Sequence, residues 1–181
     1  TGPSIAHVFG LKGRLEGTKN EMYPLVTKNN IEIVSVNLLL KDENEPVVWR
    51  GPIVGNAVKQ FYSETVWGNL DYLFVDMPPG TSDIQLTVLN NIPLTGVVMV
   101  SSPQDLVSMV VSKCVNMVNK VNVPIVGIIE NMAYVKCPCC GKKIDLYGKS
   151  HLNDISLKHH LIPLASLGID SHLTELMDSG N

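Results

Sequence analysis

The chain has 181 residues, of which 45% are hydrophobic and 17% are charged, so it can bury the core of one ordinary domain. It carries 14 basic and 17 acidic residues, and its longest basic block is Lys142 and Lys143, which excludes the electrostatic footprint of a nucleic-acid-binding protein. No run approaches the roughly 18 apolar residues of a membrane span, and the N-terminus lacks the layout of a signal peptide. We therefore expect a cytoplasmic protein that binds neither nucleic acid nor membrane.

Apolar segments rich in Val and Ile alternate with helical patterns along the chain. After a turn-rich surface segment over residues 10–30, the predicted strands span residues 31–36, 71–76, 96–102 and 124–131. The predicted helices span residues 51–68 and 102–120, with two short ones near 152–157 and 173–177. This alternation predicts an α/β fold with a doubly wound, mostly parallel sheet flanked by helices, as a single domain over residues 1–181. Cys114 falls on the apolar stripe of the second long helix, which indicates a small core residue.

The residues that follow the second and fourth predicted strands carry the functional signal, because ligands of open α/β sheets bind at the carboxyl ends of the strands. Asp76 ends the second strand and is followed by Pro78, Pro79 and Gly80, which make a stiff loop that can approach a ligand closely. An apolar strand that ends in Asp is typical of the Walker B acid, which holds the magnesium ion of a nucleotide. The alternative is that Asp76 only caps a loop.

The fourth strand ends at Asn131, whose side-chain amide has the donor and acceptor needed to read the edge of a base. An Asn at this position is more often a turn residue. A glycine-rich phosphate loop is missing from the sequence. The nearest match, Gly148 to Ser150, has Lys143 where the pattern requires its first glycine, and we expect it to be unrelated to phosphate binding.

Three of the four cysteines lie within "CPCC", residues 137 to 140. Cys137 and Cys140 form a CxxC turn that supplies two thiolates, whereas zinc or a cubane iron–sulfur cluster usually takes four ligands. A second copy of the chain, related by a two-fold axis beside the turn, would supply the other two. Cys139 is a poor third ligand, because its side chain diverges from that of its neighbour. A homodimer with a shared metal site follows from this count.

Spacing alone leaves zinc and an iron–sulfur cluster equally open, and a thioredoxin-like redox pair is disfavoured because such a pair normally opens a helix. A zinc-bridged dimeric interaction module without ATPase activity is therefore a second hypothesis. A third is a partitioning ATPase, which predicts an amphipathic membrane-binding tail or a basic surface that the sequence lacks.

Several motifs, taken together and in order, closely resemble the Mrp/ApbC-type iron–sulfur cluster carrier ATPases, relatives of MinD and of the nitrogenase iron protein. The resemblance covers nearly the whole chain. The matching stretches are "GPSI" (2–5), "VVWRGPIV" (47–54), "WGNLDYLFVDMPPGTSDIQLT" (67–87), "SSPQDL" (101–106), "VNVPIVGIIENMAY" (121–134), "CPCCG" (137–141) and "DSGN" (178–181).

This resemblance implies a deviant Walker A P-loop fold that hydrolyses ATP with Mg²⁺ as a homodimer and transfers a [4Fe-4S] cluster to apo iron–sulfur proteins. It implies that Asp76 is the Walker B acid and that Asn131 contacts adenine. It also implies that Pro78, Pro79 and Gly80 form switch II, and that Cys137 and Cys140 bind the cluster.

The chain departs from the family pattern in two places. It begins after the point at which the family has its phosphate loop and switch I aspartate, and we expect it to be a fragment of a longer protein. The family's "LGxIPLD" is altered to "LASLGID" over residues 164–170, which puts base contacts from that loop in doubt. In the WRGP segment, Trp49 is expected to anchor the core and Arg50 is a candidate dimer or switch contact.

Overall fold

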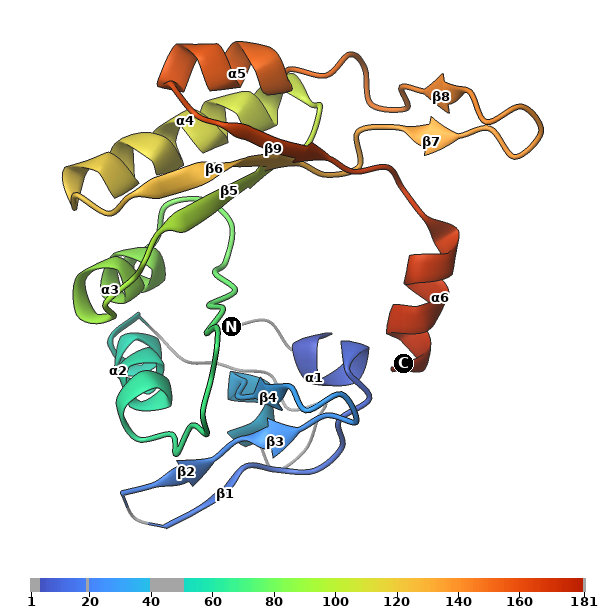
Figure 1. The fold of residues 1–181 in the computed structure, drawn as a ribbon. Coiled ribbons are helices and arrows are strands. Elements are labelled where there is room, and N and C mark those ends of the chain that lie inside the picture. The colour runs from blue at the N-terminus through green and yellow to red at the C-terminus, as the bar shows by residue number, and fades with distance from the viewer. Residues whose placement is uncertain (1–3, 19, 40–50, 181) are drawn as a thin grey trace. The chain divides into compact units, whose positions relative to one another are not determined.

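The computed structural model describes residues 4–18, 20–39 and 51–180 (Figure 1). Trp49 and Arg50 lie outside these residues. The chain divides into a first unit, Thr1–Ile92 with His172–Asn181, and a second unit, Pro93–Ser171. The single domain predicted over residues 1–181 stays a prediction.

A parallel sheet forms the centre of the second unit. Its strands β5 (Val97–Ser101), β6 (Ile125–Glu130) and β9 (Pro163–Ser166) are ordered β5-β6-β9. Helix α4 (Asp105–Lys120) connects β5 to β6, and α5 (Leu152–His159) leads into β9. The predicted strands at 96–102 and 124–131, the helix at 102–120 and the short helix near 152–157 are confirmed, as is the parallel sheet with flanking helices.

Helices α4 and α5 lie beside each other on one face of this sheet (Figure 1). Strand β5 alternates accordingly, with Val97 and Met99 buried and Val98 and Val100 exposed. Helix α4 packs through Val111, Val115 and Val118, which are nearly inaccessible, as expected for an apolar stripe at helical spacing. Cys114 lies beside that stripe and is half-buried, not fully buried as predicted.

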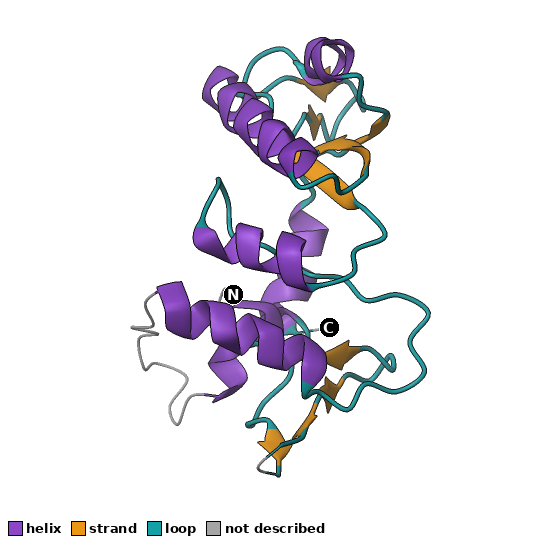
Figure 2. Cartoon of the chain, turned by 90° about the vertical axis from the view of Figure 1, so that its left-hand side faces the viewer, coloured by secondary structure: helices purple, strands orange, loops and turns teal. Residues whose placement is uncertain are grey.

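The first unit contains short helices and two-residue strands. Its helices are α1 (Ser4–Val8), α2 (Gly51–Ser63), α3 (Asp83–Asn91) and α6 (Ser171–Ser179), which begins at the last residue of the second unit. Strand β1 (Glu16–Gly17) pairs with β2 (Met22–Tyr23), and β3 (Leu25–Val26) pairs with β4 (Glu32–Ile33), both antiparallel. Helices α2 and α3 pack side by side (Figure 1 and Figure 2), and both bury apolar side chains, including Val54 and Val88. The short helix predicted near 173–177 is confirmed by α6.

Of the two strands predicted in the first unit, one is shorter than predicted and the other is wrong. The strand expected at 31–36 is reduced to β4 and continues into a 3₁₀ helix, Val36–Leu39. The segment expected to be a strand at 71–76 is irregular, and its Tyr72 and Phe74 are 79% and 86% exposed. A strand requires a neighbour for its backbone hydrogen bonds, and no strand among the described residues pairs with this segment.

Within the described residues, no helix combines the length and the apolarity needed to cross a membrane.

The packing of α5 can be tested with two substitutions in the same helix. Ile155 is 3% exposed and Leu157 is 77% exposed. Because Ile155→Ala removes buried methyl and methylene groups and leaves a cavity, we expect it to lower the free energy of unfolding by about 2–5 kcal/mol. Leu157→Ala should change it by less than about 0.5 kcal/mol. Urea denaturation measures both values, and equal effects would contradict the assigned helix face.

Candidate functional site

The CxxC turn lies at the tip of a short β-hairpin in the second unit. Strands β7 (Val135–Lys136) and β8 (Lys143–Ile144) pair antiparallel, and the turn between them holds the cysteines (Figure 1). The Cys137 N–H donates to the Lys142 carbonyl at 2.9 Å, and the Gly141 N–H donates to the Cys137 carbonyl at 2.9 Å. Gly141 has φ +71°, a left-handed conformation that glycine adopts without strain. The hairpin therefore presents its thiols at the surface, with Cys137 half-buried and Cys140 exposed.

The Cys137 sulfur lies in a polar environment that favours its thiolate. Hydrogen bonds from the backbone N–H groups of Cys140 and Cys139, followed by a contact with the Cys140 side chain, lower the pKa of Cys137 below its ordinary value. In contrast, burial raises the pKa of Cys114. Because metals bind the thiolate, the turn is chemically suited to metal binding and the α4 cysteine is not.

The base of the hairpin is fixed against the end of β9. The Ile169 N–H donates to the Tyr134 carbonyl at 2.8 Å, and Val135 forms an isolated parallel bridge with Ile169. The Tyr134 ring lies against Gly168, where an added Cβ would come within 2.7 Å of Tyr134 Cε2, and the Lys143 Nζ lies 4.0 Å from the ring centroid. The altered "LASLGID" segment therefore holds the base of the hairpin, since Gly168 leaves room for the Tyr134 ring to pack against it. This role of Gly168 was not predicted from the sequence.

A single hairpin provides few metal ligands. The described residues contain no group of three or more His, Cys, Asp or Glu side chains arranged to hold a metal ion. Cys139 is exposed and forms no such group with the other two thiols. Cys137 and Cys140 together contain two sulfur atoms, fewer than the ligands that zinc or a cubane cluster usually takes.

Asn131 follows β6 directly and is exposed, six residues before Cys137. Its backbone N–H donates to the Ser101 carbonyl at 2.8 Å, and its Oδ1 accepts the Met132 N–H at 2.9 Å. Met132 has φ +55°, so the chain turns here. Asn131 is thus a turn residue that is also exposed to solvent. Its position in a turn is compatible with the other interpretation of the sequence, in which its side-chain amide reads the edge of a base.

Glu130, the last residue of β6, is completely buried. Its Oε1 accepts the His151 N–H at 3.2 Å, whereas its Oε2 has no hydrogen-bond partner among the described residues. The carboxylate therefore ties β6 to the start of α5, where the chain returns from the hairpin. Sequence analysis missed this role, although a Glu that ends a buried strand is an available signal.

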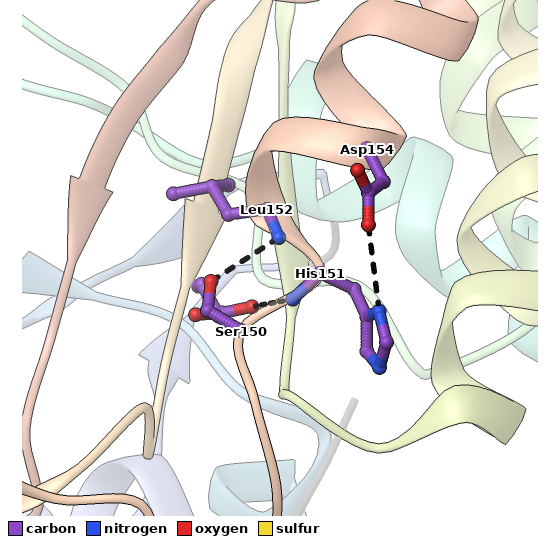
Figure 3. Close-up of polar contacts among 5 residues, drawn as sticks. Ser150, His151, Leu152 and Asp154 are labelled. Carbon is purple, nitrogen blue, oxygen red and sulfur yellow. Dashed lines mark hydrogen bonds and ion pairs between the residues drawn. The ribbon is translucent and has the colours of Figure 1, made fainter.

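The Gly148–Ser150 segment precedes α5 (Figure 3). The Leu152 N–H donates to Ser150 Oγ at 3.3 Å, and His151 Nδ1 lies 3.7 Å from Asp154 Oδ2 within the first turn of α5. Ser150 acts as a local cap for this helix, and the segment follows a hairpin and not a buried strand. Its arrangement agrees with the expectation that it is no phosphate loop.

Asp76 lies in the first unit, in the exposed loop between α2 and α3. Asp76 and Pro78 border a cavity of about 660 Å³ within that unit, lined mainly by apolar side chains. No Lys, Arg or His is among the described lining residues, so the cavity lacks the cations that would bind phosphate.

The Pro-Pro-Gly loop is held by a residue that sequence analysis missed, Gln85 of α3. Its side chain is 2% exposed and binds the carbonyls of Pro78 and Gly80. Gly80 has φ +84°, which explains the glycine at this turn. The capping-box pattern Ser82-x-x-Gln85 directly after the loop was the available signal.

The site residues predicted from the sequence thus fall into two groups, one in each unit. The second unit brings Asn131 and the Cys137–Cys140 turn onto one supported segment after β6. The first unit contains Asp76, Pro78, Pro79 and Gly80 in one loop.

Known proteins resemble the chain over its whole length. Three curated relatives have 99% of this chain aligned. The "Iron-sulfur cluster carrier protein" of Clostridium perfringens is 42% identical, with 66% of its own length covered. The protein of the same name from Aquifex aeolicus is 41% identical, with 50% covered. The "Iron-sulfur cluster transfer protein NUBPL" of Mus musculus is 37% identical, with 56% covered. The chain therefore spans about half to two thirds of the length of these relatives.

A solved structure shares the fold. It is the nucleotide-binding protein of Archaeoglobus fulgidus, in complex with ADP and with Co found in it. The TM-score is 0.83 at 35% identity, and the match covers 99% of this chain and 70% of the other. A family model described as "ParA: NUBPL iron-transfer P-loop NTPase" matches residues 1–181. The chain belongs to this family of P-loop NTPases.

Proposed function

We propose that the polypeptide containing this chain is an ATP-dependent carrier that binds a [4Fe-4S] cluster between two copies of itself and delivers it to apo iron–sulfur proteins. The observation that carries the proposal is the exposed hairpin tip, where Cys137 and Cys140 offer two thiols while the described residues hold no group of three or more side chains arranged to bind a metal ion. The names of the relatives, which are cluster carrier and transfer proteins, agree with it. The cytoplasmic location stays a prediction.

The ligand count favours a homodimer. A two-fold axis at the hairpin tip would bring Cys137 and Cys140 of both copies together and complete a four-sulfur site. A site shared by two chains opens when the subunits rearrange, whereas a site enclosed by one chain holds its metal firmly. The cluster is therefore cargo that the carrier can release.

The nucleotide part of the proposal is assigned to Asp76 and its loop. We infer that the Asp76 carboxylate holds the magnesium ion of ATP, that Pro78 to Gly80 respond to the γ-phosphate, and that Asn131 contacts adenine. The ADP complex of the Archaeoglobus fulgidus protein supports nucleotide binding by this fold. Since this chain contains no glycine-rich phosphate loop, hydrolysis is proposed for the complete polypeptide.

The cluster site can be tested by anaerobic reconstitution of the complete protein with iron and sulfide. We expect a brown dimer with broad visible absorption, and we expect Cys137→Ser and Cys140→Ser each to lose the colour, because either change removes two ligands from the shared site. Cys114→Ser and Cys139→Ser are the matched controls and should keep it. A colourless monomer, or stoichiometric zinc that resists iron loading, would contradict the proposal and favour the zinc-bridged module.

The magnesium site can be tested with Asp76→Asn in the complete protein. This change removes the charge but keeps the side-chain size, so Mg²⁺-dependent ATP turnover should fall at least tenfold while the reconstituted cluster stays bound. Asp71→Asn, at the other end of the same segment, is the matched control and should keep its turnover. Unchanged turnover of Asp76→Asn would remove the Walker B assignment.

The thiol environment predicts a pH dependence in the reduced, metal-free protein. The pKa of Cys137 is lowered and that of Cys114 is raised, so the thiolate of Cys137 forms at lower pH. Alkylation by iodoacetamide, followed by peptide mass mapping, should reach its half-maximal rate at a lower pH for Cys137 than for Cys114. In urea the two profiles should converge. The reverse order in the folded protein would show that the N–H groups do not stabilise the Cys137 thiolate.

A further inference from the structure

Both the oxygen and the nitrogen of the Gln85 side-chain amide form hydrogen bonds within the first unit. The side chain is 2% exposed and lies in the first turn of α3. Its Oε1 accepts hydrogen bonds from the Ser82 N–H at 2.7 Å and from the Ser82 hydroxyl. Its Nε2 donates to the Pro78 carbonyl at 2.6 Å and to the Gly80 carbonyl at 2.9 Å. A buried amide with all of these partners is strongly fixed in one orientation.

Helix capping explains only half of these contacts. In a capping box, the residue three positions after the N-cap accepts a hydrogen bond from the N-cap N–H, as Gln85 Oε1 does from Ser82. The two bonds donated by Nε2 lie outside the helix and hold the carbonyls on either side of Pro79. A glutamate would cap α3 equally well, but it has no N–H to donate to these carbonyls.

The loop itself has few backbone donors with which to hold its shape. Pro78 and Pro79 have no N–H, so two successive peptide units contribute only acceptors. Gly80 at φ +84° has no side chain to restrict it. The Gln85 amide supplies the missing donors from a rigid helix, and it fixes the loop two residues after Asp76.

We propose that Gln85 is a positioning residue for nucleotide hydrolysis, which holds the Pro78–Gly80 loop and thereby orients the Asp76 carboxylate. This inference rests on the hydrolysis proposed above. Gln85 is buried, and it acts through its bonds to the loop carbonyls. Small displacements of such groups are costly, since a misplacement of about 1 Å reduces the rate by roughly 100-fold.

The test compares Gln85→Glu with Gln85→Met in the complete protein. The Glu variant keeps the acceptor for Ser82 and adds a charge that suits a helix N-terminus, but it replaces two donors with an acceptor that repels the Pro78 and Gly80 carbonyls. The Met variant is apolar and of similar length, and it removes both sets of bonds. Asn90→Asp is the matched control: it makes the same amide-to-carboxylate change in the last turn of α3, at an exposed side chain.

The first readout is hydrogen exchange without nucleotide. Since Pro78 and Pro79 have no N–H, the amides that report on residues 77–81 are those of Met77, Gly80 and Thr81. We expect Gln85→Glu to accelerate their exchange at least tenfold while the Ser82 amide keeps its protection. Gln85→Met should accelerate both, and Asn90→Asp neither. A residue that only caps the helix would leave exchange in 77–81 unchanged in the Glu variant, and that result would overturn the proposal.

The second readout is ATP turnover. For Gln85→Glu we expect kcat to fall at least tenfold and KM for ATP to change less than threefold, because the change displaces the groups around the γ-phosphate and leaves the proposed adenine contact of Asn131 in place. Wild-type kcat in this variant would overturn the positioning role. If the wild-type protein hydrolyses no ATP, the proposed function fails. The exchange measurement still decides whether Gln85 holds the loop.

Discussion

The backbone hydrogen bonds at the carboxyl end of β6 support the candidate metal centre. On one side, the Asn131 N–H donates to the Ser101 carbonyl of β5; on the other, the Leu167 N–H donates to the Glu130 carbonyl. The Ala133 N–H then donates to the Leu167 carbonyl, so the chain is held for several residues beyond the strand. Because these three backbone hydrogen bonds hold the chain beyond the strand, the hairpin that follows starts from a fixed base.

That fixed base ends in a turn that is open to solvent. The hairpin is braced at Tyr134 by Gly168 and Lys143, yet its tip carries Cys137 half-buried and Cys140 exposed. A rigid base with accessible sulfur ligands suits a site completed by another molecule, since the ligands need little reorganisation when the partner arrives.

Two buried polar side chains show how the molecule places its loops. Glu130 ties the end of β6 to the N-terminus of α5, and Gln85 ties the Pro-Pro-Gly loop to the N-terminus of α3. In both units, a side chain on a regular element binds backbone groups of an irregular one. Buried polar groups are costly without partners, so such contacts select one loop conformation over many.

The sequence alone determined the elements with strong local signals. Residue type and spacing predicted the strands β5 and β6, the apolar stripe of α4, the CxxC turn and the loop after Asp76. The tertiary structure decided the features that depend on distant partners. Segment 71–76 has the composition of a strand but lacks a neighbour to pair with among the described residues. The role of Gly168 arises from its contact with the distant Tyr134. The role of Gln85 arises from two carbonyls only seven and five residues away, in a loop whose path the residue types did not reveal. A residue's type specifies the bonds it can make, and only the fold determines which groups lie within reach.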